Sequence, residues 1–173
     1  FIVLATENPI EQEGTYNLPE AQLDRFLMQI NISYPEIETE KKILIGLPDK
    51  KKSSYNFQSE NLIELISVIN ELPVGESVLS FVLNLIRNLR PESSKFDFIK
   101  KYIKWGPGPR GGQALLRASK ARALIRGNLS PTISDAIAFA QPTLRHRISL
   151  TFEAKTEDLT TDYLIKKVCD NLN

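Results

Sequence analysis

Residues that build disulfide frameworks and metal centres are scarce in this chain. Its 173 residues include one cysteine, Cys169, and one histidine, His146. A single cysteine cannot form an internal disulfide, and its place among apolar residues at helical spacing predicts a position in a helix core. A single histidine gives no metal-ligand spacing, so we expect no metal site and a structural or interface role for His146.

Long apolar runs and an excess of one charge are also absent. No apolar run reaches the roughly 18 residues that a membrane span needs, and no basic-then-apolar leader opens the chain. We therefore expect no membrane span, and a reducing compartment such as the cytoplasm. The 22 Lys and Arg residues nearly balance the 21 Asp and Glu residues, so the net charge is +1. This balance gives no broad positive field, and a nucleic-acid partner is not expected.

The N-terminal segment has the pattern of an α/β domain. The apolar run Phe1–Ala5 stops at polar residues and predicts a strand buried on both faces of a parallel sheet. Because the chain begins inside this run, we expect a piece of a longer protein. A proline-containing start at 17–20 predicts a helix, and the period-two alternation over Met28–Tyr34 predicts a second strand that ends at Pro35.

Everything after Pro35 has the pattern of helices and loops. Apolar residues recur at helical spacing over Ile37–Leu47, and again over 62–69 and 78–89, which we expect to form a helical hairpin. The run Lys50–Lys52 between them predicts a solvated loop. The path of the chain through 48–105 is otherwise poorly determined by its pattern.

Short-range signals are stronger toward the C-terminus. The segment Tyr102–Trp105 fits either the tail of a helix or a linker. A helix is predicted over 114–125, ending at Gly127, and Thr132 and Thr161 are predicted to cap the two helices that follow. The fold class is therefore mainly α, a bundle of about five or six helices preceded by a small α/β edge.

Three residues are candidates for binding a phosphate. Asn8 follows the first predicted strand, where parallel sheets bind ligands, although Asn-Pro is also a common turn signal. Arg25 lies off the apolar stripe of its helix, where a guanidinium can reach a transferring phosphate or simply form a surface ion pair. Arg110 follows two glycines at a helix N-terminus, a position that favours anions.

Taken in order, three stretches resemble the MoxR branch of AAA+ ATPases. They are FIVLATENPIEQEGTYNLPEAQLDRF at 1–26, WGPGPR at 105–110 and LRHRI at 144–148. The family more often has Gly-Ala-Ser-Pro-Arg where this chain has Gly-Pro-Gly-Pro-Arg, and the arginine is kept. The resemblance implies two domains: residues 1–35 as the C-terminal remnant of a P-loop α/β nucleotide-binding domain, and 36–173 as a helical AAA+ lid.

The resemblance also implies roles for the candidate residues. Asn8 matches the sensor-1 asparagine that positions the attacking water, and Arg25 matches the arginine finger offered to the neighbouring subunit. Arg110 matches the sensor-2 arginine, which touches the nucleotide of its own subunit. In the intact protein these roles imply ATP and Mg²⁺ as cofactors and a homo-oligomeric ring, expected to be a hexamer.

The phosphate-binding loop G-x-x-x-x-G-K-[ST] and an acidic magnesium-binding motif are both absent from these residues. The chain alone is therefore expected neither to hydrolyse ATP nor to bind it tightly. For the intact protein, the resemblance implies chaperone-like remodelling or cofactor loading of partners, including von Willebrand factor A-domain proteins. Two alternatives remain: a non-enzymatic helical protein-interaction module, and an AAA+ nucleic-acid remodeller, against which the near-neutral charge argues.

Overall fold

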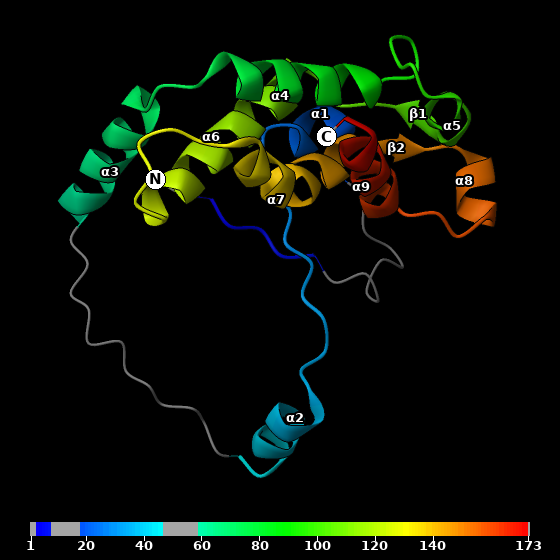
Figure 1. The fold of residues 1–173 in the computed structure, drawn as a ribbon. Coiled ribbons are helices and arrows are strands. Elements are labelled where there is room, and N and C mark those ends of the chain that lie inside the picture. Colours follow the sequence, from blue (N-terminus) through cyan, green and yellow to red (C-terminus); the bar gives the residue numbers. More distant parts are fainter. Residues whose placement is uncertain (1–2, 8–17, 47–58, 173) are drawn as a thin grey trace.

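The computed structural model describes residues 3–7, 18–46 and 59–172. Within them, helices α3 to α9 gather into a bundle, while α1 lies against it and α2 stands apart (Figure 1). In chain order, the elements are α1 Glu20–Leu23, α2 Ile37–Leu44, α3 Ser59–Glu71, α4 Glu76–Asn88, α5 Asp97–Tyr102, β1 Ile103–Trp105, α6 Pro109–Ile125, α7 Ile133–Leu144, the 3₁₀ turn η2 Arg145–Arg147, β2 Ser149–Leu150, α8 Phe152–Thr156 and α9 Thr161–Leu172. The predicted mainly α fold is confirmed.

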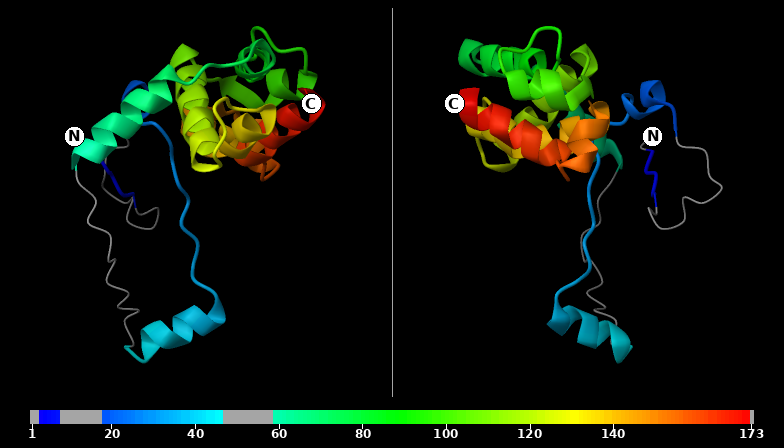
Figure 2. Two further views of the ribbon diagram at one scale, coloured as in Figure 1. Left: turned by 60° about the vertical axis from the view of Figure 1, so that its left-hand side comes forward. Right: turned by 90° about the vertical axis from the view of Figure 1, so that its right-hand side faces the viewer.

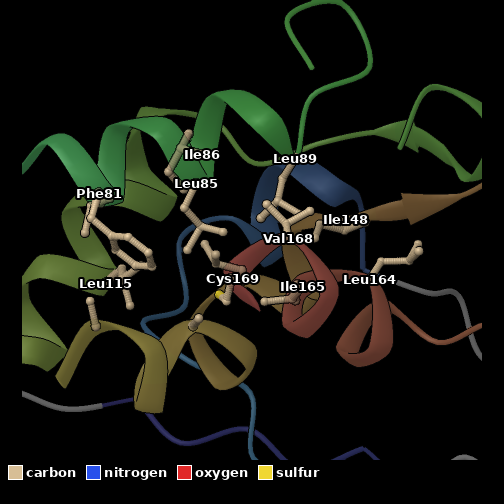
Figure 3. Packing of buried hydrophobic residues seen from close by; sticks show 14 of the residues in the cluster. Phe81, Leu85, Ile86, Leu89, Leu115, Ile148, Leu164, Ile165, Val168 and Cys169 are labelled. Atoms are coloured by element: carbon tan, nitrogen blue, oxygen red, sulfur yellow. The ribbon is translucent and has the colours of Figure 1, made fainter. Parts of the chain in front are cut away.

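The core of the bundle lies where α4, α6, α7 and α9 meet. The apolar stripe of α4 points toward α9 and α6, with Leu85 and Leu89 fully buried (Figure 3). Cys169 on α9 is also buried, as its spacing predicts, and burial raises the pKa of its thiol to about 12. The thiol is therefore a neutral core side chain, and the main contribution of the stripe is the removal of apolar surface from water.

Local signals correctly mark the C-terminal end of α6 and the start of α7, although α6 begins at Pro109, earlier than the predicted 114. Gly127, with φ +77°, follows α6 in the left-handed conformation that suits glycine. The Asp135 backbone N–H donates to Thr132 Oγ1 at 3.3 Å, and the Thr132 N–H donates to Asp135 Oδ2 at 2.9 Å. This reciprocal capping box opens α7 as expected.

Two predictions for the C-terminal half are corrected by the structure. The cap of α9 is Thr160 rather than Thr161, because Thr160 Oγ1 accepts from the Tyr163 N–H at 3.2 Å. The segment Tyr102–Trp105 is neither a helix tail alone nor a linker, since β1 follows α5 directly and pairs antiparallel with β2. Ladder partners so distant in sequence leave no local pattern by which to find them.

The two predicted strands of the N-terminal segment are wrong for the residues described. Residues 3–5 and 28–34 form no ladder, and Leu4 and Ile32 are 91% and 93% exposed. A strand is stabilised by the hydrogen bonds and side chains of a neighbouring strand, and no described strand pairs with either segment. The alternating pattern of 28–34 is present, but the described residues contain no strand that pairs with it.

Helices α2, α3 and α4 form where predicted, but their arrangement differs from a hairpin. The axes of α3 and α4 turn by 92° at the break between them, so the two helices cross at about a right angle. Helix α2 lies at the far end of an extended segment, apart from the bundle (Figure 2). No single helix in the described ranges is long and apolar enough to cross a bilayer. The predicted loop Lys50–Lys52 lies outside the described residues.

Candidate functional site

A cleft of about 470 Å³ lies between the segment after α1 and helix α6. It is lined by Asp24, Arg25, Phe26, Leu27, Arg110, Gln113, Ala114, Arg117 and Arg147. Four of these residues are arginines and one is an aspartate, so the lining carries an excess of positive charge. Such a lining suits an anion that has several oxygens. The structure thus brings Arg25 and Arg110 to one space, while Asn8 lies outside the described residues.

Arg110 sits in the first turn of α6, directly after Pro109 at the helix start. The dipole of this 17-residue helix adds positive potential at the same end. The Arg110 side chain is 57% exposed, and its Nη1 lies 3.7 Å from Asp24 Oδ2. An ion pair this long and this exposed is weak, so the guanidinium is available to a bound anion.

The loop that leads into α6 is anchored to the end of α4. A Cβ on Gly106 would lie 2.2 Å from the Leu89 carbonyl oxygen, so only glycine allows this close approach. Arg90 Nε donates to the Pro107 carbonyl at 2.7 Å, and the Pro107 side chain is buried. Contacts with the bundle core therefore set the position at which α6 begins.

Arg25 follows α1 at the opposite wall of the cleft. Its side chain is exposed, and among the described residues it forms no ion pair or side-chain hydrogen bond. The backbone is held by the Arg25 N–H, which donates to the Gln22 carbonyl at 3.1 Å. A free guanidinium on a positioned backbone can reach a ligand in this cleft or in an adjoining molecule.

Arg147, in η2, is a functional candidate that sequence reasoning did not single out. Its side chain is 3% exposed, and its Nε donates to Asp24 Oδ1 at 3.0 Å. Nη2 donates to the carbonyls of Asp24 and Phe26 at 2.9 and 2.5 Å, and Nη1 donates to those of Leu27 and Thr143. Burial lowers the pKa of Arg147, whereas the neighbouring carboxylate raises it. The sequence feature that could have pointed to Arg147 is its place in the stretch 144–148, where the apolar Ile148 follows it.

His146 also contacts the segment after α1, which Arg147 binds. Its Nε2 lies 3.3 Å from the Phe26 carbonyl oxygen. Burial and the adjacent Arg147 charge lower the pKa of His146 to about 4, so the ring is neutral near pH 7. A neutral ring can donate one hydrogen bond to this carbonyl, which fits the structural role expected for the residue.

Two family models match the chain on either side of its middle. The model "ATPase family associated with various cellular activities (AAA)" matches residues 1–28, and the "AAA lid domain" model matches residues 97–168. The first range contains Arg25, and the second contains Arg110 and Arg147. Both walls of the cleft therefore belong to matched regions.

Curated relatives and a solved structure match nearly the whole chain. Chaperone MoxR1 of Mycobacterium tuberculosis is 33% identical over 97% of this chain and 45% of its own length. Protein MoxR of Paracoccus denitrificans is 28% identical over 91% of this chain and 51% of its own. A crystal structure of a candidate ATPase from Cytophaga hutchinsonii superposes with a TM-score of 0.85 at 32% identity, covering 100% of this chain and 54% of that one.

The chain thus spans about half the length of the curated relatives it matches. The two matched models lie in the expected order, and between them they contain the stretches 1–26, 105–110 and 144–148 that carry the resemblance. The chain belongs to the MoxR family of AAA+ ATPases, and its bundle includes the family's lid domain.

Proposed function

We propose that the chain is the nucleotide-sensing and lid portion of an enzyme that hydrolyses ATP in a ring of subunits and thereby remodels partner proteins. The observation that carries the proposal is the pair of exposed arginines on the two walls of the cleft, Arg110 in the first turn of α6 and Arg25 after α1, each with a guanidinium that a phosphate can reach. Arg110 and the N-terminus of α6 suit the phosphate chain of the subunit's own nucleotide, and the exposed Arg25 suits a phosphate in an adjoining subunit. Among the described residues that line the cleft, Asp24 is the only acidic one.

The donors of the cleft fit the phosphates of ATP rather than its metal. Guanidinium groups bind phosphate oxygens, whereas Mg²⁺ needs oxygen ligands such as carboxylates. The part of the chain that the structure describes contains no group of three His, Cys, Asp or Glu side chains arranged to hold a metal ion. Arg110 would thus hold a phosphate oxygen, while Mg²⁺, which neutralises charge between phosphates, would be bound by other parts of the intact protein.

Each candidate residue has a distinct task in this proposal. Arg110 binds the nucleotide of its own subunit from the lid, and Arg25 stabilises negative charge on the transferring γ-phosphoryl group of the neighbouring subunit. Asn8, through its amide, orients the attacking water. Each nucleotide would then be contacted by Arg110 of one subunit and by Arg25 of its neighbour. Hydrolysis therefore depends on assembly, for which we propose a hexameric ring.

The domain boundary follows the same scheme. We propose that residues 1–35 complete an α/β nucleotide-binding domain and that 36–173 form the lid. Ile30 and Ile32 are 71% and 93% exposed within an alternating apolar pattern. This exposure is what a strand shows when the sheet that pairs with it lies elsewhere in the protein.

The cellular role is proposed from the relatives. The first relative named above is called a chaperone, which supports remodelling or cofactor loading of partner proteins as the output of hydrolysis. We propose von Willebrand factor A-domain proteins as one class of partner, and the cytoplasm as the compartment. Movement of the lid during the nucleotide cycle would transmit the force to the partner.

The test uses the intact protein, including the region that supplies the phosphate-binding loop. Arg25→Ala should lower turnover by about 10³-fold or more and leave ATP affinity nearly unchanged, because arginine fingers act on the transition state. Arg110→Ala should weaken ATP binding. Arg87→Ala is the matched control, since Arg87 is exposed on α4 and does not line the cleft.

ATPase rates, nucleotide titrations and the oligomeric state are measured together. Wild-type turnover by Arg25→Ala in an assembled ring would contradict the finger assignment, and unchanged affinity and rate in Arg110→Ala would remove that residue from the site. If the intact protein has no phosphate-binding loop and no turnover, the interaction-module alternative is the correct one. Salt-sensitive DNA binding by the intact protein would instead favour the nucleic-acid remodeller.

A further inference from the structure

The buried guanidinium of Arg147 has most of its partners outside the lid. Only the Thr143 carbonyl belongs to the lid, whereas the Asp24 carboxylate and the carbonyls of Asp24, Phe26 and Leu27 belong to the segment after α1. A buried charge is costly unless it is paired and fully hydrogen-bonded. The lid by itself therefore does not satisfy this arginine, and the segment after α1 does.

Arg147 holds the backbone on both sides of Arg25. Its Nη2 donates to the carbonyl that precedes Arg25 and to the carbonyl of Phe26, the residue that follows it. His146 Nε2 also lies 3.3 Å from the Phe26 carbonyl. These contacts restrain the backbone shortly before and shortly after Arg25, while its exposed side chain stays free.

The contacts between Arg147 and the segment after α1 extend to Arg110. Asp24, which accepts from Arg147, lies 3.7 Å from the Arg110 guanidinium. On the lid side, η2 continues directly from α7, and α7 packs along α6, whose first turn carries Arg110. A packed helix pair therefore links Arg147 to the lid arginine at the cleft.

We propose that Arg147 is a positioning residue that fixes the Arg25 segment to the lid, so that Arg25 and Arg110 move as one unit. The inference rests on the proposed function, in which these arginines serve nucleotides of different subunits. A lid that shifts when its own nucleotide is hydrolysed then displaces the finger offered to the neighbour. Arg147 thereby couples successive sites of the ring.

Lysine cannot replace this arginine. A guanidinium presents five N–H donors in a planar fork, and four of the acceptors of Arg147 lie on one segment. An ammonium group has three donors at one point and cannot reach the same set. Arg147→Lys therefore keeps the charge and removes the geometry.

The experiment compares ATP turnover in the intact protein carrying Arg147→Lys, Arg25→Ala or both. Arg147→Lys should lower kcat on the order of 10²-fold, the cost of misplacing a catalytic group by about 1 Å, with KM for ATP little changed. The double variant should be no slower than Arg25→Ala alone, because a finger that is absent cannot be misplaced. Arg145→Lys is the matched control: Arg145 lies two residues before Arg147 but pairs at 3.0 Å with Asp162 of α9, inside the lid.

Asp24→Asn is the second variant, because it leaves the lid sequence intact if Arg147→Lys fails to fold. It should reduce kcat in the same direction, measured well below its melting temperature, which should also fall because the buried Arg147 charge loses its carboxylate partner. Wild-type kcat in Arg147→Lys or Asp24→Asn, together with an inactive Arg25→Ala, would overturn the positioning role and leave the proposed function standing. A fully active Arg25→Ala would overturn both proposals. An equal loss of kcat in Arg145→Lys would show that general lid damage is the cause, and would also overturn the positioning role.

Discussion

Replacing Gly106 with alanine tests whether the approach of the loop to α4 determines the position of Arg110. The new Cβ would lie 2.2 Å from the Leu89 carbonyl oxygen and 2.9 Å from the Leu89 carbonyl carbon and from Arg90 Cα. All three are backbone atoms, so no side-chain rotation relieves the contact. The loop must move by roughly 1 Å to restore ordinary van der Waals separation.

The expected cost follows from the size of this overlap. Overpacking in a well-packed region destabilises a protein by about 1–3 kcal/mol, which corresponds to a fall in melting temperature of roughly 3–9 °C for a chain of this size. The displacement also shifts the first turn of α6, where Arg110 lies. ATP affinity of the intact protein should therefore fall several-fold in Gly106→Ala, on the order of 1 kcal/mol in binding.

Gly108→Ala is the matched control two residues further along. A Cβ at Gly108 meets nothing within 4 Å, and its φ of −79° is open to alanine. Loss of a glycine N-cap and reduced freedom of the unfolded chain are opposing effects, each below about 1 kcal/mol. Urea unfolding followed by circular dichroism gives both stabilities. Equal unfolding free energies for Gly106→Ala and Gly108→Ala would refute the steric reasoning.

Two further predictions concern the stability of the lid. The folded-state pKa of His146, about 4, lies below its ordinary 6.5, so the unfolded chain takes up the proton first as the pH falls. Stability should therefore decrease between about pH 6.5 and 4, and unfolding measured across this range should show a smaller decrease in His146→Gln; parallel curves would exclude the histidine as the cause. Thr132→Ala removes the capping box of α7 and should cost about 1 kcal/mol in urea unfolding, whereas Thr156→Ala, on the exposed face of α8, should cost less. Equal losses in both variants would contradict the capping role.

The helices were largely predictable because their signals are local. The apolar stripe of α4, the glycine after α6 and the Thr132–Asp135 box each depend on residues within a few positions of one another. The burial of Cys169 follows from the same periodicity. The one-residue error at the cap of α9 arose because Thr160 and Thr161 are equally suited to the position by type.

The candidate site was predictable only in part. Arg25 and Arg110 were identified by motif, and the structure places both at one cleft. Arg147 was part of a quoted motif, but its task depends on Asp24, which lies 123 residues away. The roles of Asn8, Arg25 and Arg110 in catalysis and nucleotide binding stay predictions until the intact protein is assayed.

The sequence by itself determined the helix positions, the mainly α class and the family resemblance, because periodicity, caps and motifs are properties of neighbouring residues. Tertiary structure alone decided the pairing of β1 with β2, the right-angle crossing of α3 and α4, and the junction of Arg147 with the segment after α1. It also decided that the alternating segment 28–34 forms no strand among the described residues. The strand pairing and the Arg147 contacts depend on partners that are distant along the chain, and α3, although next to α4 in sequence, packs against the more distant α6. Local pattern carries no information about which distant groups meet.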